Sequence, residues 1–120
     1  MAKLKAHGEE IARYVSPKWG GLISIRSDGT VLRRTPWSGW KVHARVKPGV
    51  DLEEWVEKKR EWFRGIPENH WMRCTTLPSL QTLEEWAEAG IAETPTGYEV
   101  EPDGRGPDGS PSWLLILGML

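Results

Sequence analysis

The stretch GWKVHARVKPGVDLEEWVEKKREWFRG, residues 39–65, decides the fold, because the spacing of its apolar residues changes near residue 50. From Trp40 to Lys47, apolar and polar side chains alternate, and this period of two is typical of a β-strand. After a Pro-Gly pair, apolar residues recur every three or four positions, as on one face of an amphipathic helix. The switch predicts a strand followed by a helix that packs on the sheet.

The alternating segment predicts a strand with one apolar face and one basic face. The apolar face is expected to point one way and consists of Trp40, Val42, Ala44 and Val46. The basic face is expected to point the other way and consists of Lys41, His43, Arg45 and Lys47. Side chains on one face of a strand lie about 6.6–6.8 Å apart, which is comparable to the spacing of phosphates along a nucleic acid.

A helix is predicted over residues 51–64. Asp51 and Glu54 have the spacing of a capping box, in which side chains bond the free N–H groups of the first turn. Gly65 is a natural C-terminal stop, and Pro67 prevents the helix from continuing. Acidic residues lie early and basic residues late in this segment, as the helix dipole prefers.

Further strands are expected in the first half of the chain, over residues 9–15, 22–26 and 30–34. The Asp28-Gly29 pair between the last two tolerates positive φ and favours a tight hairpin turn. Together with residues 40–47, these segments predict a small antiparallel sheet of three or four strands packed against the helix.

The second half predicts three smaller elements. A second helix, a short hairpin and a docked C-terminal segment are expected at residues 79–89, 91–101 and 113–117. The expected fold class is therefore α+β. Residues 1–66 form the sheet and its helix, and residues 67–120 pack on them in one compact unit.

Tryptophan and cysteine usage adds two expectations. The chain has eight Trp, and we expect five or six of them to build the core while the remainder marks a binding face. Cys74 is the only cysteine, which excludes an internal disulfide and fits a reducing cytosol. No apolar run approaches the roughly 18–20 residues that span a bilayer, and no secretory signal is expected at the start.

Charge is segregated along the chain although the net charge is only −1. Residues 1–50 contain ten Lys or Arg and three Asp or Glu, whereas residues 51–120 contain six and fourteen. Such asymmetry indicates a charged partner, or two halves of one protein that attract each other.

Two patterns resemble catalytic or cofactor motifs but lack the context that their chemistry needs. Gly104, Gly106 and Gly109 match GxGxxG, but only eleven residues follow, too few for the helix and strand of a dinucleotide fold. His70 and Cys74 lie four positions apart, but no second ligand pair or orienting group accompanies them. We therefore expect no enzyme activity, no metal and no cofactor.

The basic strand face is the most concrete candidate site. Such a face can follow a nucleic-acid backbone or meet an acidic protein surface, and it can also be an ordinary solvated face. No aromatic pair is expected on it, which disfavours the stacking of single-stranded bases. The candidate partner-binding residues are Arg26, Arg33, Arg34, Trp37, Lys41, His43, Arg45 and Lys47.

Two segments carry a resemblance. SDGTVLRR with GWKVHARVKPGVD, and the tail LEEWAEAGIAETPTGYEVEPDGRGPDGSPSWLLILGML, resemble small uncharacterised proteins of phages and integrated mobile elements. The resemblance implies a phage or prophage gene that acts in the cytoplasm of a bacterial host. Small proteins of this kind without catalytic motifs often bind and inhibit a host macromolecule, as anti-CRISPR proteins do.

The expected function is therefore a non-enzymatic protein that binds a host protein or ribonucleoprotein complex and inhibits it. The alternative is a small nucleic-acid-binding protein that uses the basic sheet face. Neither alternative involves a membrane.

Overall fold

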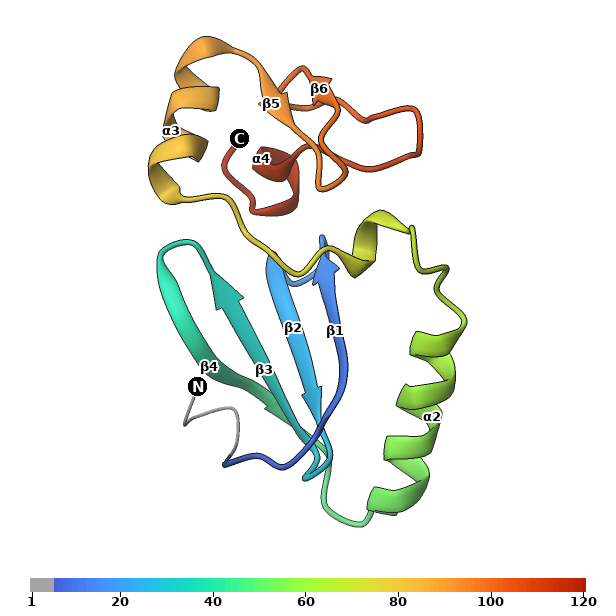
Figure 1. The fold of residues 1–120 in the computed structure, drawn as a ribbon. Helices are drawn as coiled ribbons and strands as arrows, with labels where there is room; N and C mark the ends of the chain where they lie inside the picture. The colour runs from blue at the N-terminus through green and yellow to red at the C-terminus, as the bar shows by residue number, and fades with distance from the viewer. Residues whose placement is uncertain (1–5) are drawn as a thin grey trace.

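The structure, a computed structural model, describes residues 6–120, so Lys3 and Lys5 of the basic first half lie outside the described residues. Four strands form an antiparallel sheet in sequence order (Figure 1). They are β1 (Glu10–Ser16), β2 (Gly21–Arg26), β3 (Thr30–Thr35) and β4 (Ser38–Arg45). The predicted α+β class and the antiparallel sheet are confirmed.

The β2–β3 turn forms as its sequence predicts. The side chain of Asp28 accepts a hydrogen bond from the backbone N–H of Thr30 at 2.9 Å. Gly29 has a φ of +88°, and a Cβ there would lie 2.5 Å from Cγ1 of Val46. Glycine is therefore required both for the turn and for the close approach of the chain after β4.

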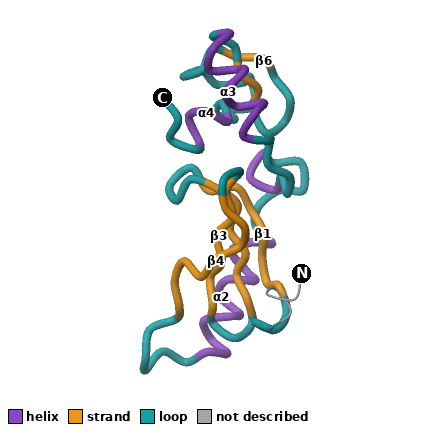
Figure 2. The backbone as a smooth tube through the Cα atoms, turned by 90° about the vertical axis from the view of Figure 1, so that its left-hand side faces the viewer, coloured by secondary structure: helices purple, strands orange, loops and turns teal. Residues whose placement is uncertain are grey.

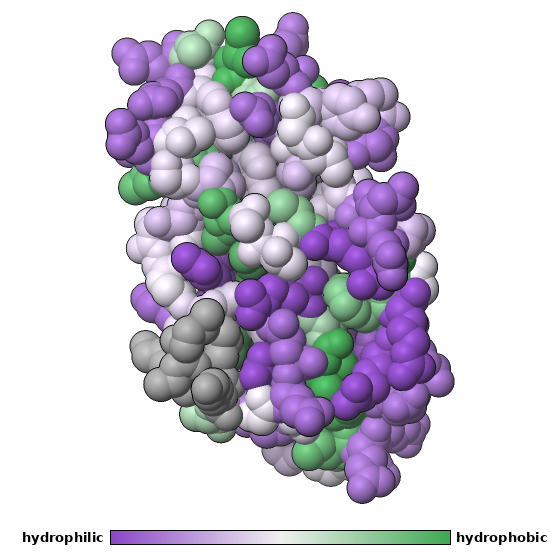
Figure 3. All heavy atoms as spheres, viewed as in Figure 1, coloured by the Kyte–Doolittle hydropathy of each residue, from purple (hydrophilic) through white to green (hydrophobic). Residues whose placement is uncertain are grey.

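Helix α2 (Leu52–Arg64) begins where the capping residue predicts, because the Asp51 side chain accepts a hydrogen bond from the N–H of Glu54 at 3.2 Å. It lies beside β1 (Figure 1). Its residues Trp55, Val56 and Phe63 pack against a cluster that includes Ile23 of β2. None of its residues is fully buried. In Figure 3, hydrophilic side chains cover the outer side of α2.

The second half contains the predicted helix, hairpin and short terminal helix. These are α3 (Leu80–Ala89), strands β5 (Ala92–Glu93) and β6 (Glu99–Val100), and α4 (Trp113–Ile116), after the 3₁₀ turn η1 (Trp71–Arg73). Figure 2 shows them as an upper lobe above the sheet and α2. The molecule is elongated, since its radius of gyration is 15.4 Å against roughly 14 Å for a compact chain of this length.

The upper lobe and the sheet share a hydrophobic core. Val15 and Leu22, which face each other on β1 and β2, are fully buried against the tail residues. The rest of this cluster is Leu83, Ala92, Trp113, Leu114, Ile116 and Leu117. The C-terminal segment is therefore core, as its apolar sequence predicts.

The tryptophans divide between the core and the surface, with five in the core as predicted. Five contact a core cluster: Trp113 is buried, and Trp40, Trp55, Trp71 and Trp86 are partly buried. Trp19, Trp37 and Trp62 are exposed.

The prediction that β4 has one continuous apolar face is corrected. Val42 is 45% exposed and Ala44 is also exposed, although Trp40 packs against the shared core. β4 is an edge strand, and α2 covers the sheet beside β1 rather than beside β4. Val42 and Ala44 also lie opposite Leu32 and Val31, which are adjacent on β3, so they point to opposite faces and do not form one apolar side.

Candidate basic and aromatic binding surface

A β-bulge in β4 places the predicted basic residues on both faces of the sheet. Leu32 of β3 lies opposite Val42, while Val31 lies opposite Ala44, so His43 is an extra residue on β4. Residues directly opposite each other in an antiparallel pair point to the same face.

The consequence is that Lys41 and Arg45 point to opposite faces, because they lie opposite Arg33 and Thr30, which are three positions apart on β3. The prediction that these two cations share one face is corrected. Lys47 follows the end of β4 and is not part of the strand.

Arg33 and Lys41 share the face on which α2 packs. Arg33 lies opposite Ile23, and Ile23 belongs to the cluster that contacts α2. The helix covers this face beside β1 (Figure 1), so the part of the face on β3 and β4 is open.

An aromatic ring from a distant part of the chain lies on this open part of the face. The Trp19 ring, in the β1–β2 turn, meets the His43 ring edge to face with centroids 4.5 Å apart. The carbonyl of Gly20 accepts a hydrogen bond from Nη2 of Arg33 at 3.0 Å. This bond directs the turn towards β3. The ammonium Nζ of Lys18, the residue before Trp19, lies 5.1 Å from the centre of the Trp19 ring.

The expectation that no aromatic pair lies on the basic face is therefore corrected. Trp19 is 46% exposed, and it extends this surface to the turn between β1 and β2. No local signal predicts this contact, because strand periodicity does not show where a turn will fold.

A cavity of about 310 Å³ lies at the β3–β4 end of this surface. Trp37, at the turn between the two strands, is 50% exposed beside it. The cavity is lined by Arg33, Thr35, Trp37, Ser38, Lys41, Val42 and His43. We call Lys18, Trp19, Arg33, Trp37, Lys41 and His43 the basic–aromatic surface.

In the part of the chain that the structure describes, the cations of this surface have no carboxylate partners. Within residues 6–120, Lys18, Arg33 and Lys41 form no ion pair. Arg33 also lies directly opposite Lys41, an arrangement of like charges that destabilises a sheet. A concentrated positive charge without compensation is typical of a surface that binds an anionic partner.

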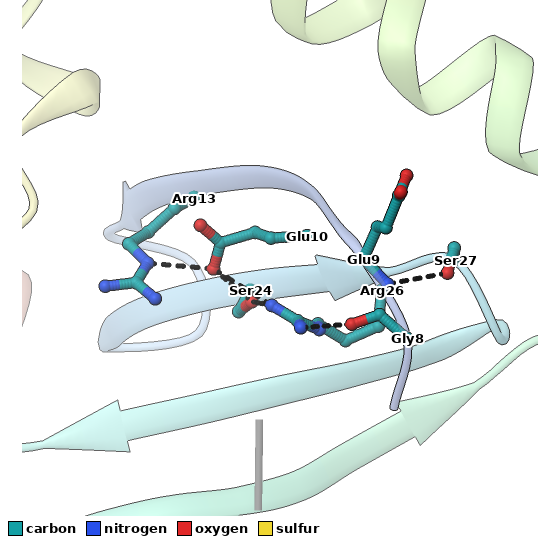
Figure 4. Close-up of polar contacts among 7 residues, drawn as sticks. All are labelled: Gly8, Glu9, Glu10, Arg13, Ser24, Arg26 and Ser27. Atoms are coloured by element: carbon teal, nitrogen blue, oxygen red, sulfur yellow. Dashed lines mark hydrogen bonds and ion pairs between the residues drawn. The ribbon is translucent and has the colours of Figure 1, made fainter. Parts of the chain in front are cut away.

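Three other predicted partner-binding residues lie elsewhere. Arg26 is 5% exposed, and its Nη1 lies 3.4 Å from Oε2 of Glu10, on the opposite face of the sheet (Figure 4). Arg34 lies opposite Leu22 and lines a neighbouring cavity of about 520 Å³. Arg45 is exposed on the face of Thr30.

The two motif-like patterns have structural roles. His70 caps η1, since its Nδ1 accepts the N–H of Met72 at 3.1 Å, and half-buried Cys74 packs against the shared core. Among residues 6–120, no group of three His, Cys, Asp or Glu side chains is placed to hold a metal ion.

The glycine-rich loop is a turn that is held by hydrogen bonds to the side chain of Asp108. Asp108 accepts hydrogen bonds from Thr96 at 2.7 Å and from the N–H of Ser110 at 3.0 Å. Hydrogen bonds from Ser110 and Thr96 lower the pKa of the Asp108 carboxyl below its usual range.

Comparisons of this chain with protein-family models, with curated proteins and with solved structures found no match. No helix in the described part of the chain has the length and apolarity needed to cross a membrane. The basis for a function is therefore the chemistry of the site itself.

Proposed function

We propose that this chain is a non-enzymatic binding protein that takes single-stranded nucleic acid on its basic–aromatic surface. The observation that carries the proposal is the placement of the Trp19 and Trp37 rings among cations that have no acidic partner among the described residues. Cations that neutralise phosphates supply sequence-independent affinity. Exposed aromatic rings add stacking with any base.

Exposed rings favour a single strand over a duplex. The faces of paired bases are already stacked in a duplex, so rings such as Trp19 and Trp37 gain nothing from them without unstacking. In a single strand each base offers a free face to an aromatic side chain. The surface therefore offers rings for the bases and cations for the phosphates of such a strand.

Fluorescence anisotropy of a labelled oligothymidylate and of a labelled duplex at low salt tests the proposal. We expect tighter binding of the single strand, with a logarithmic salt slope of about −0.7 for each phosphate contacted. Lys41→Gln should weaken binding and make the slope shallower. Arg45→Gln removes the same charge from the opposite face of the same strand and should change binding much less.

Alanine in place of Trp19 separates stacking from charge. The loss of one stacked base costs about 1–3 kcal/mol, which is about 5- to 150-fold in affinity, and it should leave the salt slope unchanged. If the wild-type protein binds no oligonucleotide even at low salt, this function is wrong.

A second candidate is supported by the exposed ring of Trp37 at the tip of the β3–β4 hairpin. Trp and Arg are the residues that most often dominate protein interfaces, and charged neighbours accelerate encounter. With the resemblance to phage proteins, this favours an inhibitor that acts inside a bacterium on a host protein or ribonucleoprotein complex.

The second candidate has its own test. Purified CRISPR effector complexes are the first partners to try, and protection of phage from them is the activity to measure. Trp37→Ala should abolish both binding and protection. Binding to such a complex without binding to free oligonucleotides would favour the inhibitor over the nucleic-acid-binding protein.

A further inference from the structure

Another cavity lies between α2 and the sheet. Its volume is about 330 Å³, at the lower end of the range of about 300–1,000 Å³ that is typical of small-molecule sites. We propose that this cavity binds a small molecule that carries a planar aromatic ring and an anionic group, such as a nucleotide. This site goes beyond the proposed function, because the cavity shares no residue with the basic–aromatic surface. The residues that line it are Tyr14, Ile25, Trp55, Lys58, Lys59 and Trp62.

The cavity is built from two sides. Its four residues from α2 occupy positions i, i+3, i+4 and i+7, which lie on one side of a helix. On the sheet, Tyr14 lies opposite Ile23, and Ile25 is two positions further along β2, so all three share the face on which α2 packs. Figure 1 shows α2 beside β1, the strand that contributes Tyr14. Segments far apart in the sequence therefore line one space.

Aromatic rings give this space its affinity for a planar ligand. The Tyr14 and Trp62 rings meet edge to face, with centroids 4.9 Å apart and planes at 72°, so at least one of them keeps both faces free of the other. Trp62 is 44% exposed, and Trp55 and Tyr14 are only partly buried. A planar ligand in the cavity would cover aromatic surface that is now in contact with water.

Lysine at the same cavity gives it a preference for an anion. The Nζ of Lys59 lies 5.7 Å from the centre of the Trp55 ring, and within residues 6–120 it forms no ion pair. Lys58, in contrast, is paired with Glu54 at 2.9 Å. No Asp or Glu lines the cavity. An anionic group could therefore approach Lys59 without displacing a carboxylate from it.

The two features together select the class of ligand. A purely apolar molecule would leave Lys59 without an anion, and a free phosphate would leave the rings uncovered. A nucleotide has a flat base for the rings and a phosphate for the ammonium group, and it can come from a free mononucleotide or from a nucleic-acid strand.

The test follows the indole N–H signals of Trp55 and Trp62 by NMR. The probes are thymidine monophosphate, thymidine and inorganic phosphate. We expect saturable shifts of both signals with thymidine monophosphate and binding about fivefold tighter than that of thymidine, because only the nucleotide reaches Lys59 with an anion. Inorganic phosphate should bind more weakly than either.

Three variants separate the ring from the charge. Trp62→Ala should weaken both thymidine and thymidine monophosphate at least fivefold, the effect of one lost stacking contact. Lys59→Gln should weaken only thymidine monophosphate, until it binds no better than thymidine. Lys47→Gln removes the same charge from an exposed position outside the cavity and should change neither. Lys59→Gln keeps every ring in place, so its effect will not reflect lost packing.

An oligothymidylate of about twelve nucleotides then identifies the source of the ligand. If it shifts the Trp55 and Trp62 signals as the mononucleotide does, the cavity takes one nucleotide of a strand. If it binds without shifting them, the cavity takes a free small molecule. If thymidine monophosphate moves neither signal, or binds Lys59→Gln as tightly as wild type, the site is wrong, whether or not the oligonucleotide binds to the basic–aromatic surface.

Discussion

Arg26 and Arg33 lie on opposite faces of the same sheet, and only Arg26 has a carboxylate beside it. Glu10 approaches Arg26 and also accepts hydrogen bonds from Ser24 at 2.6 Å and Arg13 at 2.9 Å (Figure 4). On the other face, Arg33 lies opposite Lys41, and its Nε has no partner among the described residues.

The difference between the two faces separates a structural use of charge from a binding use. A buried cation needs an anion, and on the Arg26 face the protein supplies one itself. The part of the other face on β3 and β4 stays open and positively charged, so its anion must come from outside. Variants that remove the apolar packing or the carboxylate of the first face test this comparison.

The largest loss of stability is expected from Trp113→Ala, which removes a buried side chain that packs against β1 and β2. Trp113 is buried in the cluster that includes Val15 and Leu22, so its loss should cost about 3–5 kcal/mol of unfolding free energy. Urea denaturation measures this cost. Trp37→Ala is the matched control at an exposed site, with a change within about 0.5 kcal/mol. If Trp113→Ala kept its stability but lost binding, the C-terminal segment would be an interface rather than part of the core.

Glu10→Gln should have the next largest effect, because it keeps the shape of the network and removes its negative charge. Arg26 then loses the carboxylate beside it, which should cost about 2–3 kcal/mol. Glu57→Gln breaks an exposed pair with Arg64 and should cost less than about 0.5 kcal/mol. Binding of oligonucleotide by Glu10→Gln should match wild type, and weaker binding would contradict the separation of the faces.

Two hydroxyl side chains give a smaller contrast. The Ser79 hydroxyl accepts the N–H of Thr82 at 3.1 Å and caps α3, so Ser79→Ala should lower the free energy of unfolding by about 1 kcal/mol. Thr35→Val removes a hydroxyl without a partner and should leave stability unchanged or raise it. Thermal unfolding of both variants compares them, and a clear loss of stability in Thr35→Val would mean that its hydroxyl has a partner within the protein.

Local features of this fold follow from the sequence because each depends on a few neighbouring residues. The Asp28-Gly29 turn, the Asp51 cap and the apolar tail are of this kind. The bulge at His43 and the position of Trp19 depend on contacts between segments far apart in the chain. Sequence patterns therefore single out Arg33, Trp37, Lys41 and His43 of the candidate surface, but they do not predict that Lys18 and Trp19 lie beside them.

The smallest effect is expected from pH acting on Asp28, at the β2–β3 turn. Partial burial alone would raise the pKa of its carboxyl, but hydrogen bonds from Thr30 and His7 outweigh this and lower the pKa below its usual value. A lowered pKa in the folded state means that the stabilisation is present above the unfolded value and is lost as pH falls through the folded one. The carboxyl is partly exposed, so we expect a difference of a few tenths of a kcal/mol between wild type and Asp28→Asn near neutrality, shrinking below about pH 4. Urea midpoints across this range measure it, with Asp103→Asn as an exposed control, and a constant difference at every pH would contradict the assignment.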